Sequence, residues 1–127
     1  MNIKEISANS LSYIGDAVYT LAVRQYFIIN KYQSSRSLQK LCNGYNSAAG
    51  QTRVYQRLLE QGFFKEEELA VFKAGRNHIK RVPRNSSLYE YQCASGLEAV
   101  CGYLYLEDKE RLEQFFAQVF QGGINNE

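Results

Sequence analysis

Residues 11–19 read LSYIGDAVY, a run of apolar and small residues that is interrupted by one acid, Asp16. A second run of this kind, ASGLEAVCGY, spans residues 94–103 and contains one acid, Glu98. Each run is typical of a mostly buried helix, in which an unpaired carboxylate is unfavourable by several kcal/mol or more. Since a hard metal ion with oxygen ligands would compensate both charges, the pattern predicts that Asp16 and Glu98 lie together and share one ion.

Each acid also has a simpler interpretation. Aspartate is a poor helix former in a helix interior, and Asp16 could be a surface residue or a core acid paired with Arg24 or another base. Glu98 fits that interpretation less well, because the residues three and four positions away on the same helix are small and leave room for an ion or a phosphate. These neighbours are Ala94, Ser95, Cys101 and Gly102.

The composition favours a single all-α domain over residues 1–127. Hydrophobic residues make up 45% of the chain and charged residues 22%, as in ordinary folded proteins. One proline, and few stretches that alternate between apolar and polar residues, favour helices over a β-sandwich or a barrel. The chain is long enough to bury a core without disulfides or a structural metal.

The sequence also predicts a cytoplasmic protein. No stretch approaches the roughly 18 apolar residues that a membrane span needs, and no apolar segment of signal-peptide length precedes Leu11. The three cysteines, Cys42, Cys93 and Cys101, form neither a metal-type pair nor an even disulfide framework. Their neighbours are apolar or small, so we expect buried, reduced thiols.

Helical periodicity and capping residues predict a bundle of about six helices. The first begins near Ser7 or Asn9 and ends at about Ile29, and the second ends before Asn43-Gly44, two residues that tolerate left-handed backbone geometry. The predicted spans are about 7–29, 34–42, 48–60, 65–77, 88–106 and 108–121. The span 88–106 is apolar nearly all round, so it should be the central element.

The first predicted helix has more apolar surface than one side of a helix needs. Its expected core stripe consists of Leu11, Ile14, Val18, Leu21, Ala22 and Tyr26. Further apolar residues on the same helix are Tyr13, Tyr19 and Phe27. A self-complementary apolar face of this kind predicts a two-fold homodimer.

A net charge of +2 conceals an uneven charge distribution. Residues 73–84, named the basic segment below, include five basic residues and His78 but no acid. We expect this segment to contact phosphates through its basic side chains, with Asn77 as a further polar contact. The residues are Arg76, Asn77, Lys80, Arg81 and Arg84. Residues 78–87 contain the only proline, Pro83, and are predicted to form a loop. The alternative is a solvated loop of charges.

The two acidic runs together resemble a known family. Residues 11–19 resemble the signature helix of ribonuclease III domains, and residues 97–106, LEAVCGYLYL, resemble their last conserved catalytic helix. The short length, the Gly75-Arg76-Asn77 element, Ser47-Ala48 with Gln51, and the absence of a following double-stranded-RNA-binding domain are similar to Mini-ribonuclease III. The resemblance covers nearly the whole chain, from about residue 11 to residue 120.

This resemblance implies a Mg²⁺-dependent endoribonuclease that cuts double-stranded RNA, with the maturation of large-subunit ribosomal RNA precursors as its role. By motif position, Asp16 matches the catalytic aspartate and Glu98 the essential metal-binding glutamate, so both are expected to be catalytic and to bind metal. Ribonuclease III domains pair through their signature helices, which implies a homodimer with two sites, each cutting one strand. The basic segment would then hold the RNA backbone, with Asn77 bonded to a 2′-hydroxyl. His78 is expected to contact RNA or to be simply exposed.

Full-length members of the family carry further acids where this sequence has Asn9, Ser12 and Ser95, which leaves the number of bound ions open. These losses motivate a second hypothesis, a non-catalytic RNA-binding or ribosome-associated scaffold. A third hypothesis is a helical adaptor for another protein. The sequence does not reveal the natural transcript, the base preference, or whether a ribosomal protein assists.

Overall fold

The computed structural model describes residues 2–30 and 34–121. A short 3-10 helix, η1 (Ile3–Glu5), is followed by six α-helices. They are α1 (Ala8–Asn30), α2 (Ser35–Asn46), α3 (Ala48–Glu60), α4 (Glu66–Asn77), α5 (Leu88–Glu107) and α6 (Lys109–Phe120). The described ranges contain no strand, so the predicted all-α class is confirmed. None of the helices in these ranges is long and apolar enough to cross a membrane.

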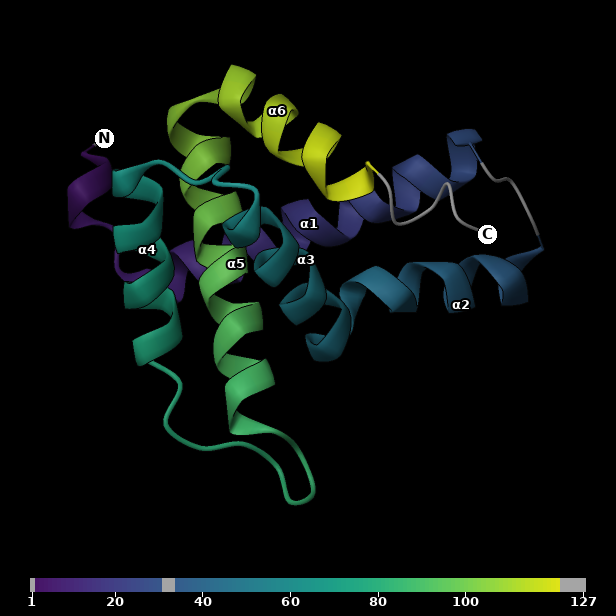
Figure 1. Cartoon of the computed structure of the whole chain (residues 1–127), viewed down its shortest axis with the longest axis horizontal. Coiled ribbons are helices and arrows are strands. Elements are labelled where there is room, and N and C mark those ends of the chain that lie inside the picture. The colour runs from purple at the N-terminus through teal and green to yellow at the C-terminus, as the bar shows by residue number, and fades with distance from the viewer. Residues whose placement is uncertain (1, 31–33, 122–127) are drawn as a thin grey trace.

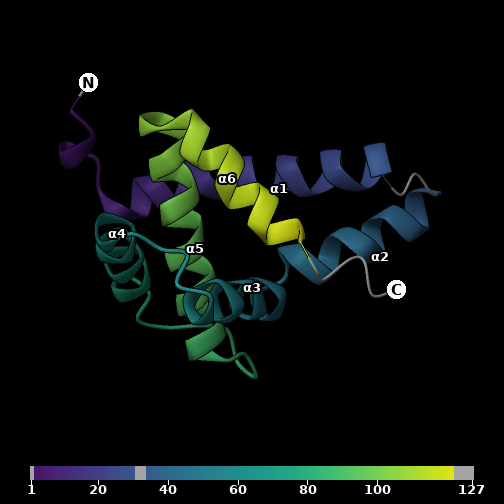
Figure 2. The same cartoon turned by 45° about the horizontal axis from the view of Figure 1, so that its top comes forward.

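Helix α5 is the central element, as its apolar sequence predicts. It packs against α1, α3, α4 and α6, and Figure 1 shows it standing between α4 and α3, with α1 crossing it. Ten of its residues are buried, including Leu97, Val100 and Leu104. Figure 2 shows α1 and α2 projecting to one side of this bundle.

The crossing of α1 over α5 depends on two glycines. A Cβ atom added to Gly15 would overlap the carbonyl group of Glu98 and lie 2.9 Å from the backbone nitrogen of Gly102. A Cβ added to Gly102 would overlap the carbonyl oxygen of Leu11. The two backbones therefore touch at this point, and the close contact brings Asp16, the residue after Gly15, near Glu98.

The buried face of α1 differs from the predicted stripe. The residues of α1 that the structure buries are Leu11, Ser12, Gly15, Tyr19, Val23 and Phe27. Tyr19 and Phe27, expected as surplus, are therefore core residues, whereas Leu21, expected in the core, is 66% exposed. The glycine contact with α5 sets the rotation of the helix, and a helix that is apolar on several sides does not reveal this rotation in its sequence.

The predicted end of the second helix was wrong. Helix α2 continues through Asn43 and Gly44 to Asn46, and Ser47 ends it. The Ser47 side chain accepts a 3.0 Å hydrogen bond from the backbone N–H of Gly50 and so caps α3. The boundary between α2 and α3 is therefore set by Ser47, which caps α3. Gly44 lies inside α2 and has no positive φ. The other helix boundaries agree with the predictions within about two residues.

A buried ion pair joins α4 to α6. Arg111 donates to both carboxylate oxygens of Glu68, at 2.7 and 2.9 Å, and to the carbonyl oxygen of Phe63. Burial opposes ionisation of Glu68, yet these hydrogen bonds hold its pKa below the ordinary value. The three cysteines are buried and unpaired, as predicted.

Candidate active site

The structure brings Asp16 and Glu98 into one hollow of about 430 Å³, which we name the acidic hollow. Asp16 comes from α1 and Glu98 from α5, while Gln51 of α3 and His78 after α4 complete its walls. The Asp16 side chain is exposed and Glu98 is half-buried. Two acids that are far apart in the sequence therefore face a shared space, as the two motifs predict.

The two acids have no basic partner among the residues that the structure describes. In the described ranges, no lysine or arginine forms an ion pair with Asp16 or Glu98, and the expected alternative of an Asp16–Arg24 pair is not found. Burial raises the pKa of Glu98 to about 8, and the neighbouring Asp16 carboxylate contributes, while the Gln51 hydrogen bond opposes the shift. Without a cation, the hollow therefore retains a proton near neutral pH, and a divalent cation would favour its release.

Ser12, Ser95 and His78 form a hydrogen-bonded network beside the acids. The Ser12 hydroxyl donates to the carbonyl oxygen of Ser95 at 2.8 Å and lies 3.1 Å from the Ser95 hydroxyl. Nε2 of His78 lies 2.8 Å from the same Ser95 hydroxyl. Of the two expectations for His78, a simply exposed ring is wrong, because this hydrogen bond draws the ring into the wall of the hollow, and an RNA contact stays a prediction. In the described part of the chain, no group of three His, Cys, Asp or Glu side chains lies close enough together to hold a metal ion. Asp16 and Glu98 are thus the two acids that line the hollow.

Gln51 is the main site residue whose role the sequence did not reveal. Its Nε2 donates to Oε2 of Glu98 and to the backbone oxygen of Asn46, both at 3.1 Å. Its Oε1 is buried without a hydrogen-bond partner among the described residues, and so is Oδ1 of Asn46. Both side chains line the acidic hollow. The only signal in the sequence was the resemblance of Ser47-Ala48 with Gln51 to a family element.

The basic segment lies beside the acidic hollow, and most of it does not line it. Lys80, Arg81 and Arg84 are exposed on the loop between α4 and α5, which Figure 1 shows below these helices. Arg76 and Asn77 end α4, where Nε of Arg76 donates to Oδ1 of Asn77 at 3.1 Å. Of the whole segment, only His78 and Ile79 reach the hollow.

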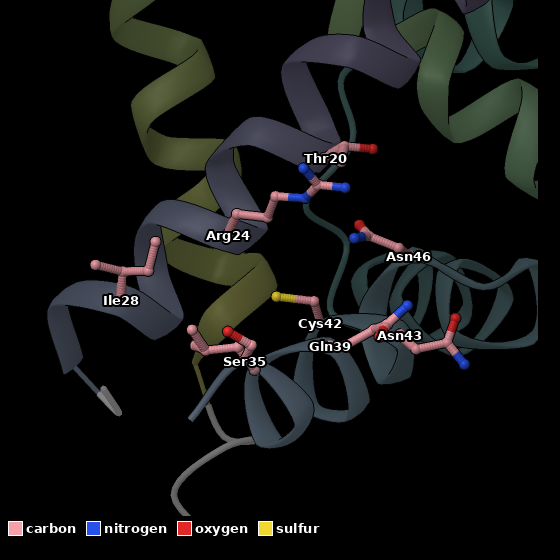
Figure 3. Close-up of a pocket in the computed structure, with 9 residues that line it drawn as sticks. Thr20, Arg24, Ile28, Ser35, Gln39, Cys42, Asn43 and Asn46 are labelled. Atoms are coloured by element: carbon pink, nitrogen blue, oxygen red, sulfur yellow. The ribbon is translucent and has the colours of Figure 1, made fainter. Parts of the chain in front are cut away.

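A second pocket, of about 560 Å³, lies between α1 and α2. Figure 3 shows Arg24 and Thr20 of α1 facing Asn46 and Cys42 of α2 across it. It shares Asn46 with the acidic hollow but contains no acid. It therefore lacks the ligands that a hard cation needs.

The fold agrees with what comparison to known proteins finds. Residues 9–109 match the Ribonuclease III domain. The chain is 35% identical to Mini-ribonuclease 3 of Staphylococcus aureus, over 93% of this chain and 90% of the relative. It is 37% identical to Mini-ribonuclease 3 of Clostridium tetani (93% and 79%) and 32% identical to that of Streptococcus pneumoniae (95% and 96%). The X-ray structure of a Fusobacterium nucleatum protein, 30% identical, superposes with a TM-score of 0.77 over 92% of this chain and 91% of that one.

Proposed function

The chain belongs to the ribonuclease III family, in its Mini-ribonuclease 3 branch, and from this premise we propose how it acts. It is an endoribonuclease of the ribonuclease III type, with double-stranded RNA as its substrate. We propose that Asp16 and Glu98 are its catalytic and metal-binding residues, with Mg²⁺ as the cofactor. The observation that carries this proposal is a pair of acids, without basic partners among the described residues, that face one hollow.

The acidic hollow suits a hard divalent cation. Mg²⁺ takes oxygen ligands, usually one or two carboxylates with several waters and substrate phosphates. The hollow offers two carboxylates and two buried amide oxygens that have no partner among the described residues. When bound, the ion would supply a water that is nucleophilic near neutral pH and would stabilise charge on the phosphate oxygens.

The chain's own residues orient the reaction. Gln51 holds the Glu98 carboxyl group by a hydrogen bond, whereas Asp16 is exposed and would be accessible to an RNA phosphate. Glu98 must lose its proton before it can act as a ligand. Because its pKa is raised to about 8 in the absence of the ion, we expect the Mg²⁺ affinity, and with it the cleavage rate at subsaturating Mg²⁺, to increase with pH up to about that value.

The test of the site is cleavage of duplex RNA in the presence of Mg²⁺. Asp16→Asn and Glu98→Gln should each lower the cleavage rate by about three orders of magnitude or more, while leaving the RNA affinity within about threefold. Glu107→Gln, an exposed change on the same helix as Glu98, is the matched control and should cleave like the wild type. A near wild-type rate for either site variant would contradict the assignment.

We propose that Arg76, Asn77, Lys80, Arg81 and Arg84 bind the RNA backbone. Double-stranded RNA is recognised through phosphates and 2′-hydroxyls, because its deep major groove excludes side chains. The support for this proposal is a group of cationic side chains beside an acidic hollow, which would itself repel phosphates in the absence of a cation.

This assignment predicts a change in salt dependence. Replacing Arg76, Lys80 and Arg81 by alanine should weaken RNA binding and flatten the slope of log affinity against log salt by about one for each phosphate that is no longer bound. Lys109→Ala, at the start of α6 and so beyond the far end of α5, is the control and should leave the slope unchanged. An unchanged slope in the triple variant would remove the basic segment from the binding surface.

We propose that the enzyme acts as a homodimer through α1. Large apolar side chains are exposed along this helix: Tyr13 at 85%, Leu21 at 66%, Ile28 at 51% and Ile29 at 69%. Their presence on one helix supports a self-complementary interface. Two copies would supply two sites, each cutting one strand of a duplex.

We propose that the substrate in the cell is a precursor of large-subunit ribosomal RNA, processed in the cytoplasm with possible assistance from a ribosomal protein. Support comes from the resemblance to Mini-ribonuclease III and from three reduced cysteines, which suit a reducing compartment. Purified enzyme should cut duplex regions of that precursor faster than it cuts unrelated duplexes of the same length. Equal rates on both would contradict this substrate.

A further inference from the structure

Gln51 is held in one orientation by its two hydrogen-bond partners. The residue is 3% exposed, and its Nε2 lies 3.1 Å from both Oε2 of Glu98 and the backbone oxygen of Asn46. The backbone carbonyl group of Asn46 can only accept hydrogen bonds, and a Glu98 carboxyl oxygen accepts in either protonation state. The atom that faces them must therefore be the amide nitrogen. Oε1 of Gln51 is thereby directed away from both partners.

Two buried oxygens of the hollow are left without a donor. Among the described residues, Oε1 of Gln51 and Oδ1 of Asn46 are the two buried side-chain polar atoms that have no hydrogen-bond partner. Folded proteins pair nearly all such groups. Both residues line the acidic hollow with Asp16 and Glu98. Their position indicates a donor that enters the hollow.

We infer that Gln51 is a positioning residue of the ion site, which holds Glu98 through Nε2 and, with Asn46, accepts hydrogen bonds from ion-bound waters through its free oxygen. The inference rests on the proposed function, because it takes Asp16 and Glu98 as the ligands. It explains how two carboxylates suffice beside the neutral Ser12 and Ser95. Groups that orient ligands and bound waters commonly matter for metal affinity nearly as much as the ligands do.

The competing explanation is that Gln51 only ties α2 and α3 to α5. A structural tie of this kind would affect unfolding and would leave the affinity for a metal ion unchanged in the folded protein. Binding of Mn²⁺ alone, without RNA, separates the two explanations. Free Mn²⁺ is counted directly by electron paramagnetic resonance.

The experiment compares three variants with the wild type. Gln51→Met keeps the length of the side chain and removes both polar atoms, and we expect Mn²⁺ binding to weaken by about 10-fold or more. Asn46→Leu should weaken binding by about threefold to 10-fold, since one acceptor is removed. Gln56→Met is the matched control on α3, where the exposed Gln56 contacts Tyr89, and it should bind as the wild type does.

The outcomes separate this inference from the proposed function. Suppose that Gln51→Met and Asn46→Leu both bind Mn²⁺ with wild-type affinity, whereas Asp16→Asn and Glu98→Gln lose binding. This result would overturn the inference and leave the proposed ion site in place. If the two acid variants also bind as the wild type does, or if the wild type binds no Mn²⁺, the proposed site itself fails. Should Gln51→Met not fold, Asn46→Leu decides, because the structure gives the Asn46 side chain no hydrogen bond whose loss would disturb the fold.

Discussion

Replacing Glu98 by Gln should stabilise the metal-free protein at alkaline pH while abolishing its activity. Without a cation, burial and the Asp16 carboxylate make the ionised form of Glu98 unfavourable in the folded state. Glutamine has nearly the same shape and carries no charge, and its side-chain oxygen can still accept the hydrogen bond from Gln51. The variant therefore removes the charge without leaving a cavity.

The direction of the pH dependence of stability follows from whether the folded or the unfolded chain binds more protons. The pKa of Glu98 rises from 4.5 to about 8 on folding, so between these values the folded state holds a proton that the unfolded chain has released. The free energy of unfolding of the wild type must then fall as pH rises through this window. One pKa unit corresponds to about 1.4 kcal/mol, and solvent reaching the half-buried carboxyl group reduces the effect, so we expect a loss of about 2 kcal/mol.

The assay is urea unfolding in the presence of a chelator at about pH 5 and about pH 8.5. Glu98→Gln should match the wild type at the lower pH and exceed it by about 2 kcal/mol at the higher. Glu107→Gln controls for removing a carboxylate from the same helix. A constant difference between Glu98→Gln and the wild type at both pH values would refute the reasoning, because it would mean that Glu98 is not forced to ionise in an unfavourable place.

Further predictions concern the helix crossing, the buried ion pair and the exposed face of α1. Gly15→Ala should lower the free energy of unfolding by about 2–3 kcal/mol and the cleavage rate by about 100-fold, because the new Cβ pushes α1 away from α5. Gly44→Ala, where a new Cβ meets open space, should instead raise the free energy of unfolding by about 0.5–1 kcal/mol. Urea unfolding measures the stability of both variants, and equal stability changes would contradict the close backbone contact between α1 and α5. Arg111→Met should destabilise the fold by about 3–5 kcal/mol, since Glu68 is left buried and unpaired, and a loss within about 0.5 kcal/mol would show that the pair is unimportant. Leu21→Lys should convert a dimer to a monomer in sedimentation equilibrium, and an unchanged mass would place the interface elsewhere.

Local sequence signals predicted most of the helices and their order. Helix α3 begins after a serine cap and ends before Gly62, whose positive φ of 69° favours glycine. The central position of α5 followed from its lack of a polar face. In contrast, the rotation of α1 depends on a backbone contact between Gly15 and Gly102, which are far apart in the sequence. The length of α2 depends on Ser47 rather than on the glycine inside the helix.

The two acids were recognisable because each interrupts an apolar or small-residue run. The other side chains of the site could not be recognised from the sequence. Gln51 meets Glu98 across 47 positions of the chain, and His78 meets Ser95 across 17, so their roles exist only after the helices pack. Asn46 becomes part of the site because α2 extends to it, which the predicted end at about residue 42 excluded. The charge pattern of the basic segment was visible, whereas its position beside the hollow was not.

The most direct test of a shared ion is a crystal structure of the protein grown with Mn²⁺, with the metal located by its anomalous scattering. We expect a peak with carboxylate oxygens of both Asp16 and Glu98 within about 2.0–2.5 Å. A metal held by other residues, or by one of these acids while the other is out of reach, would contradict the account.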